Sequence, residues 1–289
     1  MKRRWLSNLL GASTALALLY GCAGNGGGLQ GDPAIKPIGQ NSFIYVRNGN
    51  EIMKGELDGS MTSRVFLAPS GIENLRLSPD RKVILFSMNS ILQRVNVDGS
   101  DLREVAGFKC ADWNEDGSMI FAITSANWIV RVKPDGTGKA TLVYNGASGG
   151  GIDHIDVTAD GRKIAFTSYR TTYERINLIN SDGTSHLDLY SAESRASRPR
   201  WNQAGSAIVF ERRQVIGAIT SQSDVYSMAS TGGSLMKLTS NAIDDTLPCF
   251  AQNGTILFVR NGDVMMMQGD GSFQSVWLTT PEAESSSDC

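Results

Sequence analysis

A pattern of two turns, repeated about every forty residues, constrains the fold of this chain more than any other feature. The stretch from Ile155 to Tyr190 shows it most clearly. Four short apolar runs lie there, with turns at Ala159-Asp160-Gly161 and at Asp182-Gly183. Such runs, bounded by Gly and Asp, predict strands joined by hairpins, because a tight hairpin needs the positive φ that Gly takes at little cost. Four strands in roughly forty residues form one blade of a β-propeller.

The copies can be aligned on their turns. Four residues before the first turn's glycine, or before the arginine in its place, five segments carry a large apolar residue: Leu77, Trp113, Val157, Trp201 and Phe250. Seven residues before the second turn's glycine, six segments do so: Ile52, Leu92, Ile129, Ile176, Val225 and Val264. A lone four-stranded sheet cannot cover its two apolar faces, so the copies must stack. The sequence predicts an all-β fold, a six-bladed β-propeller of four-stranded antiparallel blades, over residues 33–280.

Closure of the ring is the least clear part of the pattern. Residues Ile35 to Ile38 are the candidate first strand of the N-terminal unit, although Pro33 and Pro37 flank them and proline is tolerated mainly at strand ends and edges. The final segment, 281–289, reads PEAESSSDC. Because it is polar, acidic and without bulky side chains, we expect it to be a disordered tail.

Residues 1–21 have the pattern of a signal peptide, with a positive start at Lys2 and an apolar segment from Leu9 to Tyr20. The segment is too short to span a bilayer comfortably. Leu19-Tyr20-Gly21-Cys22 is similar to the bacterial lipobox, with a bulky Tyr where a small residue is usual. We therefore expect acyl chains on Cys22 and a flexible, Gly-rich linker over 22–32. The alternative is an ordinary cleaved signal with an incidental cysteine.

The expected lipid anchor implies a location in the bacterial envelope. Two or three acyl chains hold a protein stably on a membrane. Ala23 follows Cys22 in place of the Asp that marks retention in the inner membrane of enteric bacteria, which favours the outer membrane, facing the periplasm. The net charge is −2 and the basic residues are scattered, so nothing indicates a nucleic-acid partner. We expect a monomer.

The repeat resembles that of the TolB-like six-bladed propellers. The resemblance is carried by the Ser78-Pro79-Asp80 turn, the Ile/Val-x-Phe strand that follows such turns, and the later Asp-Gly hairpin. It covers essentially all of the chain after the signal peptide, and it is specific for fold rather than function. The Tol-system protein itself carries an α/β domain before its propeller and is soluble in the periplasm. We expect this chain to differ from it in both respects, because no segment here could supply that domain and Cys22 is expected to carry acyl chains.

Three of the cysteines remain if Cys22 is acylated. Cys110 and Cys249 lie on the first strands of the third and sixth units, which face each other across a six-bladed ring. A disulfide needs Cα atoms within roughly 7 Å, so we expect no bond between these two. A bond between Cys249 and Cys289 is left open.

Three motifs that could carry chemistry are better explained by structure. Residues 146–150 match G-x-S-x-G, but another strand pattern follows in place of the helix of a nucleophile elbow. The two histidines, His154 and His186, are too few for a zinc site. The Asp-Gly turns lie one to a blade, whereas calcium needs six to eight oxygens around one ion. We expect no catalytic residue, no cofactor and no metal.

One set of polar residues remains as a candidate site. In propellers the loops into each first strand and those between the second and third strands share one face, and long loops on a rigid scaffold often bind partners. On this face the sequence places Asp153, His154, Arg170, Tyr173, Glu174, Arg195, Arg198, Arg212, Arg213, Asp244 and Asp245. Arg and Tyr are enriched where proteins anchor each other. The predicted contact set is Tyr169, Arg170, Tyr173, Arg198, Arg212 and Arg213, with His154 beside it. The alternative is a merely solvated rim.

The leading hypothesis is a non-catalytic scaffold. It is a membrane-anchored lipoprotein that binds an envelope protein, such as a peptidoglycan-associated one, or a glycan, through one face of the ring. The alternative is a polysaccharide lyase or hydrolase at the channel mouth, because some related propellers are lyases; it would use His154 with Arg198 as a carboxylate clamp. A third hypothesis is a small-molecule sensor that uses the channel.

Overall fold

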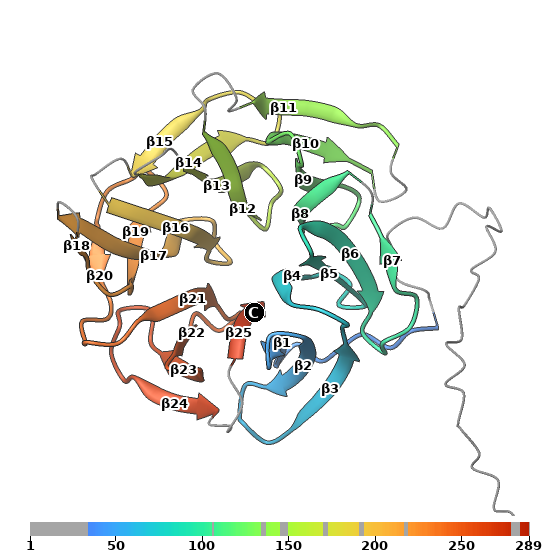
Figure 1. Ribbon diagram of the computed structural model, residues 1–289, viewed down its shortest axis with the longest axis horizontal. Coiled ribbons are helices and arrows are strands. Elements are labelled where there is room, and N and C mark those ends of the chain that lie inside the picture. The colour runs from blue at the N-terminus through green and yellow to red at the C-terminus, as the bar shows by residue number, and fades with distance from the viewer. Residues whose placement is uncertain are drawn as a thin grey trace, which may run out of the picture.

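The computed structural model describes residues 34–105, 107–133, 137–144, 150–169, 173–190, 194–216, 219–278 and 284–288. Strands and turns make up these ranges, and none of them contains a helix that could cross a membrane. The strands form six blades around a central axis, with the first strand of each blade nearest that axis (Figure 1). The predicted six-bladed β-propeller is confirmed.

The blades follow one another along the chain, apart from the strand that closes the ring. Blade 1 contains β25 (Glu284–Asp288), β1 (Ser42–Arg47), β2 (Glu51–Glu56) and β3 (Thr62–Leu67). Blade 2 contains β4 (Ile72–Leu77), β5 (Val83–Met88), β6 (Ile91–Asn96) and β7 (Arg103–Glu104). Blade 3 contains β8 (Phe108–Trp113), β9 (Ile120–Thr124), β10 (Trp128–Val132) and β11 (Ala140–Tyr144).

Blades 4 and 5 share one continuous sheet. Blade 4 contains β12 (Gly151–Val157), β13 (Lys163–Tyr169), β14 (Glu174–Asn180) and β15 (Leu187–Tyr190). Blade 5 contains β16 (Ser194–Trp201), β17 (Ala207–Ile216), β19 (Asp224–Ala229) and β20 (Met236–Lys237), with β18 (Ile219–Thr220) paired to the end of β17. Blade 6 contains β21 (Asp245–Phe250), β22 (Ile256–Arg260), β23 (Asp263–Met267) and β24 (Ser275–Leu278).

The core lies between the blades rather than within them. Four consecutive residues of β5 are fully buried, because alternate side chains point to opposite faces of the sheet and both faces are covered. Val83 and Leu85 pack in a cluster shared with blade 3, while Ile84 and Phe86 pack in one shared with blade 1. Six such clusters separate the six blades in turn. The stacking expected from the repeat is therefore present.

We name the two ends of the ring by the connections they carry. The loop face is the end at which each first strand begins and the second strand connects to the third. The turn face is the opposite end, which carries the turns between the first and second strands and the hairpins between the third and fourth. Those candidate residues that the structure describes lie at the loop face.

The ring closes in a way that the sequence does not predict. Residues Ile35 to Ile38 form no strand; Ile38 is instead buried between blades 1 and 2. The closing strand is β25, which pairs antiparallel with β1 from Ile44↔Asp288 to Arg47↔Glu284. The expectation of a disordered tail is thus wrong for residues 284–288. The reason is that β1 would otherwise leave a row of unpaired backbone groups at the centre of the ring, and even a polar segment can pair with it.

The two described cysteines have different states. Cys110 is a free thiol and is 1% exposed. Cys249 is disulfide-bonded, so the prediction that these two are not joined is confirmed. Cys289 lies outside the described residues, and its pairing with Cys249 stays a prediction.

Candidate functional site

A β-bulge recurs in the first strands. Asn74, His154, Arg198 and Leu247 occupy the same offset in blades 2, 4, 5 and 6, and all four have a positive φ, between 48° and 56°. At each of them the register with the second strand shifts. Because a bulge adds a residue and re-aims its side chain, this feature sets the direction of two predicted site residues, His154 and Arg198.

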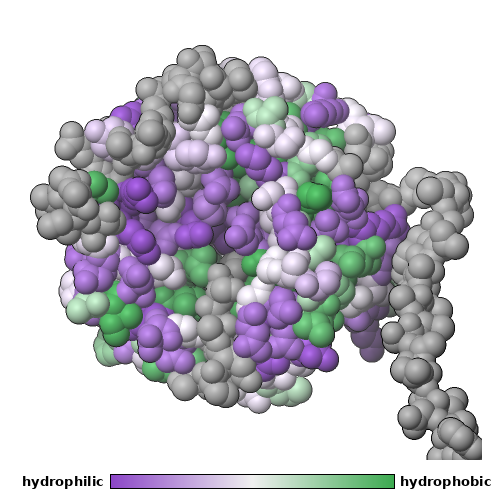
Figure 2. Space-filling view, viewed as in Figure 1, coloured by the Kyte–Doolittle hydropathy of each residue, from purple (hydrophilic) through white to green (hydrophobic). Residues whose placement is uncertain are grey.

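A pocket of about 170 Å³ opens on the loop face where blades 4 and 5 meet. The blades are bridged there by parallel pairing of Glu174 in β14 with Arg195 in β16. The residues lining the pocket are Glu174, Arg195, Ser197, Arg198, Glu211, Arg213 and Ser223. We call this the arginine pocket. Figure 2 shows hydrophilic side chains gathered over the middle of the face that it draws.

The charges of the arginine pocket are only partly paired. Arg198 forms an ion pair with the buried Glu211, whose other carboxylate oxygen lies 3.5 Å from the Ser223 hydroxyl. Burial disfavours the Arg198 cation, but the carboxylates around it, Glu211 foremost, raise its pKa above the ordinary value. Arg213 lies 3.4 Å from Asp244 in an exposed pair.

Two charged groups of the pocket remain available. Within the described residues, the side chains of Arg195 and Glu174 make no hydrogen bond or ion pair, although the Glu174 carboxylate lies near enough to help raise the pKa of Arg198. A guanidinium presents its donors in a fixed fork that matches a carboxylate or phosphate. The pocket can therefore accept an acidic group of a partner at Arg195 and Arg213, while Glu174 remains for a donor beside that group.

The predicted contact set divides around this pocket. Arg198 and Arg213 line it. Arg212 is the neighbour of Arg213 in β17, so it points the opposite way, and its guanidinium stacks on Tyr226 with 5.0 Å to the ring centroid. Tyr173 stacks with Arg175 at 5.8 Å.

Of the three remaining predicted residues, the structure describes only Tyr169. Tyr169 ends β13 on the loop face, 41% exposed, with its ring over Gly151. Arg170 and Cys22 fall outside the described residues, as does the G-x-S-x-G stretch except for its last glycine.

His154 is set apart from the arginine pocket and does not line it. Its Nδ1 lies 3.5 Å from Asp153 Oδ2. Burial, followed by Arg198 and Arg76, lowers the pKa of His154 well below its usual value, so the ring is neutral at pH 7. Burial also raises the pKa of the nearby Cys110 to about 12. A protonated, buried thiol is inert, so Cys110 is not a nucleophile for this histidine.

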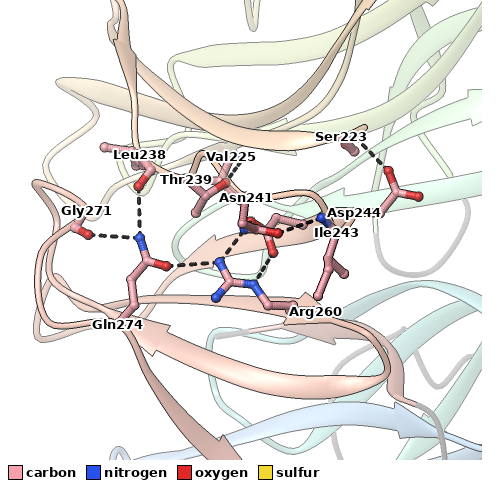
Figure 3. A network of polar contacts seen from close by, with 11 residues as sticks. Ser223, Val225, Leu238, Thr239, Asn241, Ile243, Asp244, Arg260, Gly271 and Gln274 are labelled. Carbon is pink, nitrogen blue, oxygen red and sulfur yellow. Dashed lines mark hydrogen bonds and ion pairs between the residues drawn. The ribbon is translucent and has the colours of Figure 1, made fainter. Parts of the chain in front are cut away.

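The two aspartates before blade 6 have different roles. Asp245 is fully buried and accepts two hydrogen bonds from Arg260, at 2.6 and 2.9 Å, and one from Asn241 at 2.7 Å. Arg260 also reaches Gln274, so the network ties blade 6 together (Figure 3). Asp245 is thus a structural residue. Asp244 is exposed and accepts from the backbone N–H of Ser223 at 2.7 Å, which fixes it beside the pocket.

A second and larger cavity, of about 320 Å³, opens at the channel mouth on the turn face. Asp112, Asp156 and Arg200 line it, and Arg76 lies directly behind them. Arg200 pairs with Asp156 at 2.8 Å, and Arg76 lies 3.5 Å from Asp112 and 3.7 Å from Asp156. These two arginines and two aspartates therefore balance one another's charge.

Arg76, Asp112, Asp156 and Arg200 form a charged layer between the first strands. The sequence analysis missed this charged layer, although its members recur at one position of the repeat. Each of its members directly precedes one of the aligned apolar residues, and Cys249 holds the same place in blade 6. The two aspartates also tie neighbouring blades, since Asp112 accepts from Val157 N at 2.8 Å and Asp156 from Trp201 N at 2.7 Å. Over the described ranges, no group of three or more His, Cys, Asp or Glu side chains is placed to hold a metal ion.

Comparisons with known proteins agree with this architecture. No protein-family model matches the sequence. The Tol-Pal system protein TolB of Geobacter sulfurreducens is 32% identical over 74 residues, which is 26% of this chain and 16% of that protein. The structure of a putative TolB from Agrobacterium tumefaciens matches with a TM-score of 0.67 at 18% identity, over 82% of this chain and 88% of that one.

An enzyme shares the architecture as well. An oligogalacturonate lyase, solved in complex with manganese, matches with a TM-score of 0.52 at 14% identity, over 75% of this chain and 70% of that one. At such identities a shared structure establishes the fold, while the activity has to be argued from the site. The chain is a six-bladed β-propeller. Within that class its fold is similar to that of the TolB propellers, and a 74-residue stretch is similar to TolB in sequence.

Proposed function

We propose that this chain is a non-catalytic, lipid-anchored protein of the bacterial envelope that binds another envelope protein through its loop face. The arginine pocket carries the proposal, because it is a formed cavity in which a guanidinium and a carboxylate lack partners within the described residues. Arginine in a partly desolvated pocket is typical of the anchor points of protein interfaces. The likeness to TolB, named for a Tol-Pal system, supports an envelope partner.

Within the described residues, the thiol beside His154, that of Cys110, is buried and protonated, which also favours binding over catalysis. The His154 ring lies outside the arginine pocket.

The experiment is cross-linking of the chain in its native envelope, followed by identification of the captured protein. Reversing the charge of the pocket with Arg195→Glu and Arg213→Glu is expected to lower capture about tenfold or more, because a charge at the centre of an interface typically contributes at least 1.4 kcal/mol. Arg162→Glu is the matched control, since Arg162 is an exposed arginine on the turn face. Capture that is equal in all three variants would exclude the arginine pocket as the binding site.

A second candidate function is the cleavage of acidic polysaccharides. It is favoured by the structural likeness to an oligogalacturonate lyase and by the arginines, which can clamp uronate carboxylates. Turnover of oligouronates by the purified chain, abolished by His154→Ala, would establish this activity in place of the scaffold. Failure to turn over such sugars, together with capture of an envelope protein, supports the scaffold.

A further inference from the structure

The chain enters the propeller on the turn face. Residues 34–41 precede β1 and lie against turns of that face. Ile38 N donates to the carbonyl oxygen of Arg81 in blade 2 at 3.1 Å. Gln252 of blade 6 donates its amide to Gln40 at 3.0 Å. The entry segment is therefore held where blades 6, 1 and 2 meet.

The two most exposed large apolar side chains of the described residues belong to the blades at this entry. Phe273 is 84% exposed on the hairpin between β23 and β24 in blade 6. Met61 is 66% exposed on the hairpin between β2 and β3 in blade 1. The same end of other blades also carries exposed apolar residues, Leu102, Leu187 and Leu235, at 41 to 48%. Single exposed apolar residues are common and need no explanation, whereas the backbone conformation of Phe273 does.

Phe273 is held in a backbone conformation that a bulky residue avoids. Its φ is 54°, in the left-handed region. Phe273 lies three residues after Asp270, the first residue of the Asp-Gly turn. The equivalent residue also has a positive φ in four other blades, where it is Asp101, Gly138, Ser185 or Ser234. Small or polar residues tolerate this region, whereas a bulky one there is an outlier. In blade 6 the phenyl ring of Phe273 is exposed and does not offset this backbone strain by packing. The stability of the fold therefore does not explain a phenylalanine at this position.

We propose that the turn face lies on a lipid bilayer, with Phe273 and Met61 inserted into its interface. The inference rests on the lipid-anchored function proposed above. Residues 22–33 separate the acylated Cys22 from the described chain and can span at most about 40 Å when extended. An anchor there keeps the entry segment, and the apolar side chains of the blades that hold it, close to the membrane. Aromatic rings are enriched at this depth of a bilayer.

The charges on the same hairpins indicate which lipid surface fits. Asp270 and Asp58 lie three residues before Phe273 and Met61, and each accepts the backbone N–H two residues further on at 2.9 Å. The hydroxyls of Ser272 and Ser60, followed by these backbone N–H groups, lower the pKa of the two carboxyls, so they remain negative. An anionic surface would repel them, and a zwitterionic one would not. With this face on the bilayer, the arginine pocket at the opposite end of the ring points toward the aqueous compartment, where a partner can reach it.

The test is depth-dependent quenching on the acylated full chain in phosphatidylcholine–phosphatidylethanolamine vesicles. In Phe273→Trp, the added tryptophan is expected to lose about half of its emission to brominated acyl chains, because interfacial residues sit roughly 5–10 Å deep. Emission of the parent chain, which has native tryptophans, is subtracted. Ile243→Trp is the matched control, since Ile243 is 44% exposed on the loop face, and it is expected to show no quenching.

Each outcome decides between the orientation and the anchor. Flotation of the chain with vesicles, lost in Cys22→Ala, tests the anchor by itself. If the chain floats and position 273 is not quenched, or is quenched no more than 243, the orientation is wrong while the anchor stands. If the chain does not float, both fall. Phe273→Ser is expected to keep or raise the urea midpoint; a large fall would show that Phe273 supports the fold and would overturn the proposal.

Discussion

At the scale of single residues, the hairpin glycines have two roles. Those that the structure describes supply the positive φ that the turn needs, as the Asp-Gly pattern predicts. Some also allow neighbouring blades to approach. A Cβ at Gly271 would lie 2.9 Å from the carbonyl oxygen of Leu238 in blade 5, and one at Gly99 would lie 2.6 Å from that of Val65 in blade 1. A Cβ at Gly59 would meet nothing within 4 Å.

This difference gives a matched pair of substitutions. Gly59→Ala places a side chain in the left-handed region, with φ 74°, and is expected to cost about 1–2 kcal/mol of unfolding free energy. Gly271→Ala carries the same strain, with φ 85°, and must also push two backbones apart. We expect it to cost about 1–3 kcal/mol more, as overpacking does. Urea unfolding measures both, and equal losses would show that the close approach of the blades carries no energy.

At the scale of elements, the sequence predicts strands well and the arginine pocket in part. Short apolar runs and two recurring turns define blades 2 to 6, and the second of these turns marks blade 1 as well. The loop-face rule brings Arg198 and Arg213 together. Glu211 and Ser223 were missed because no motif marks them; they lie on either side of a stretch that reads as a connection. The strand β17 instead extends to Ile216, so Arg212 and Arg213 are strand residues. Alternation along that strand then turns Arg212 away from the pocket.

The charged layer between the first strands is the feature to test at this scale. Asp156 lies between Arg200 and Arg76 and accepts the backbone N–H of Trp201 in the next blade. Asp156→Ala is expected to cost about 3–5 kcal/mol, because it leaves buried guanidinium groups without their counter-charge. Asp188→Ala is the control: its carboxylate is 43% exposed, 3.5 Å from Arg175, and surface pairs contribute about 0–1 kcal/mol. Urea unfolding measures both variants. If Asp156→Ala loses no more unfolding free energy than Asp188→Ala, the charged layer does not stabilise the fold.

At the scale of the whole molecule, ring closure was the part of the fold that the sequence could not predict. Blades are recognised by apolar residues at fixed offsets, and the segment Glu-Ser-Ser-Ser-Asp of β25 contains none. Its place is determined by a partner about 240 residues earlier, where the N-terminal unit begins with β1 and lacks a strand of its own at the axis. The composition of the tail does not reveal this pairing, because it is β1 that needs a partner strand.

The requirement can be tested by shortening the chain. A chain that ends at Ala283 lacks β25, so β1 exposes an unpaired edge and the ring is no longer closed through backbone hydrogen bonds. We expect a loss of about 3 kcal/mol or more of unfolding free energy, and dimers or larger species formed through the open edge. A chain that ends at Asp288 is the control, because it keeps β25 and lacks only Cys289. Urea unfolding and size-exclusion chromatography measure the two effects. If the chain ending at Ala283 is as stable and as monomeric as the control, β25 is dispensable and closure depends on the packing between blades 6 and 1 alone.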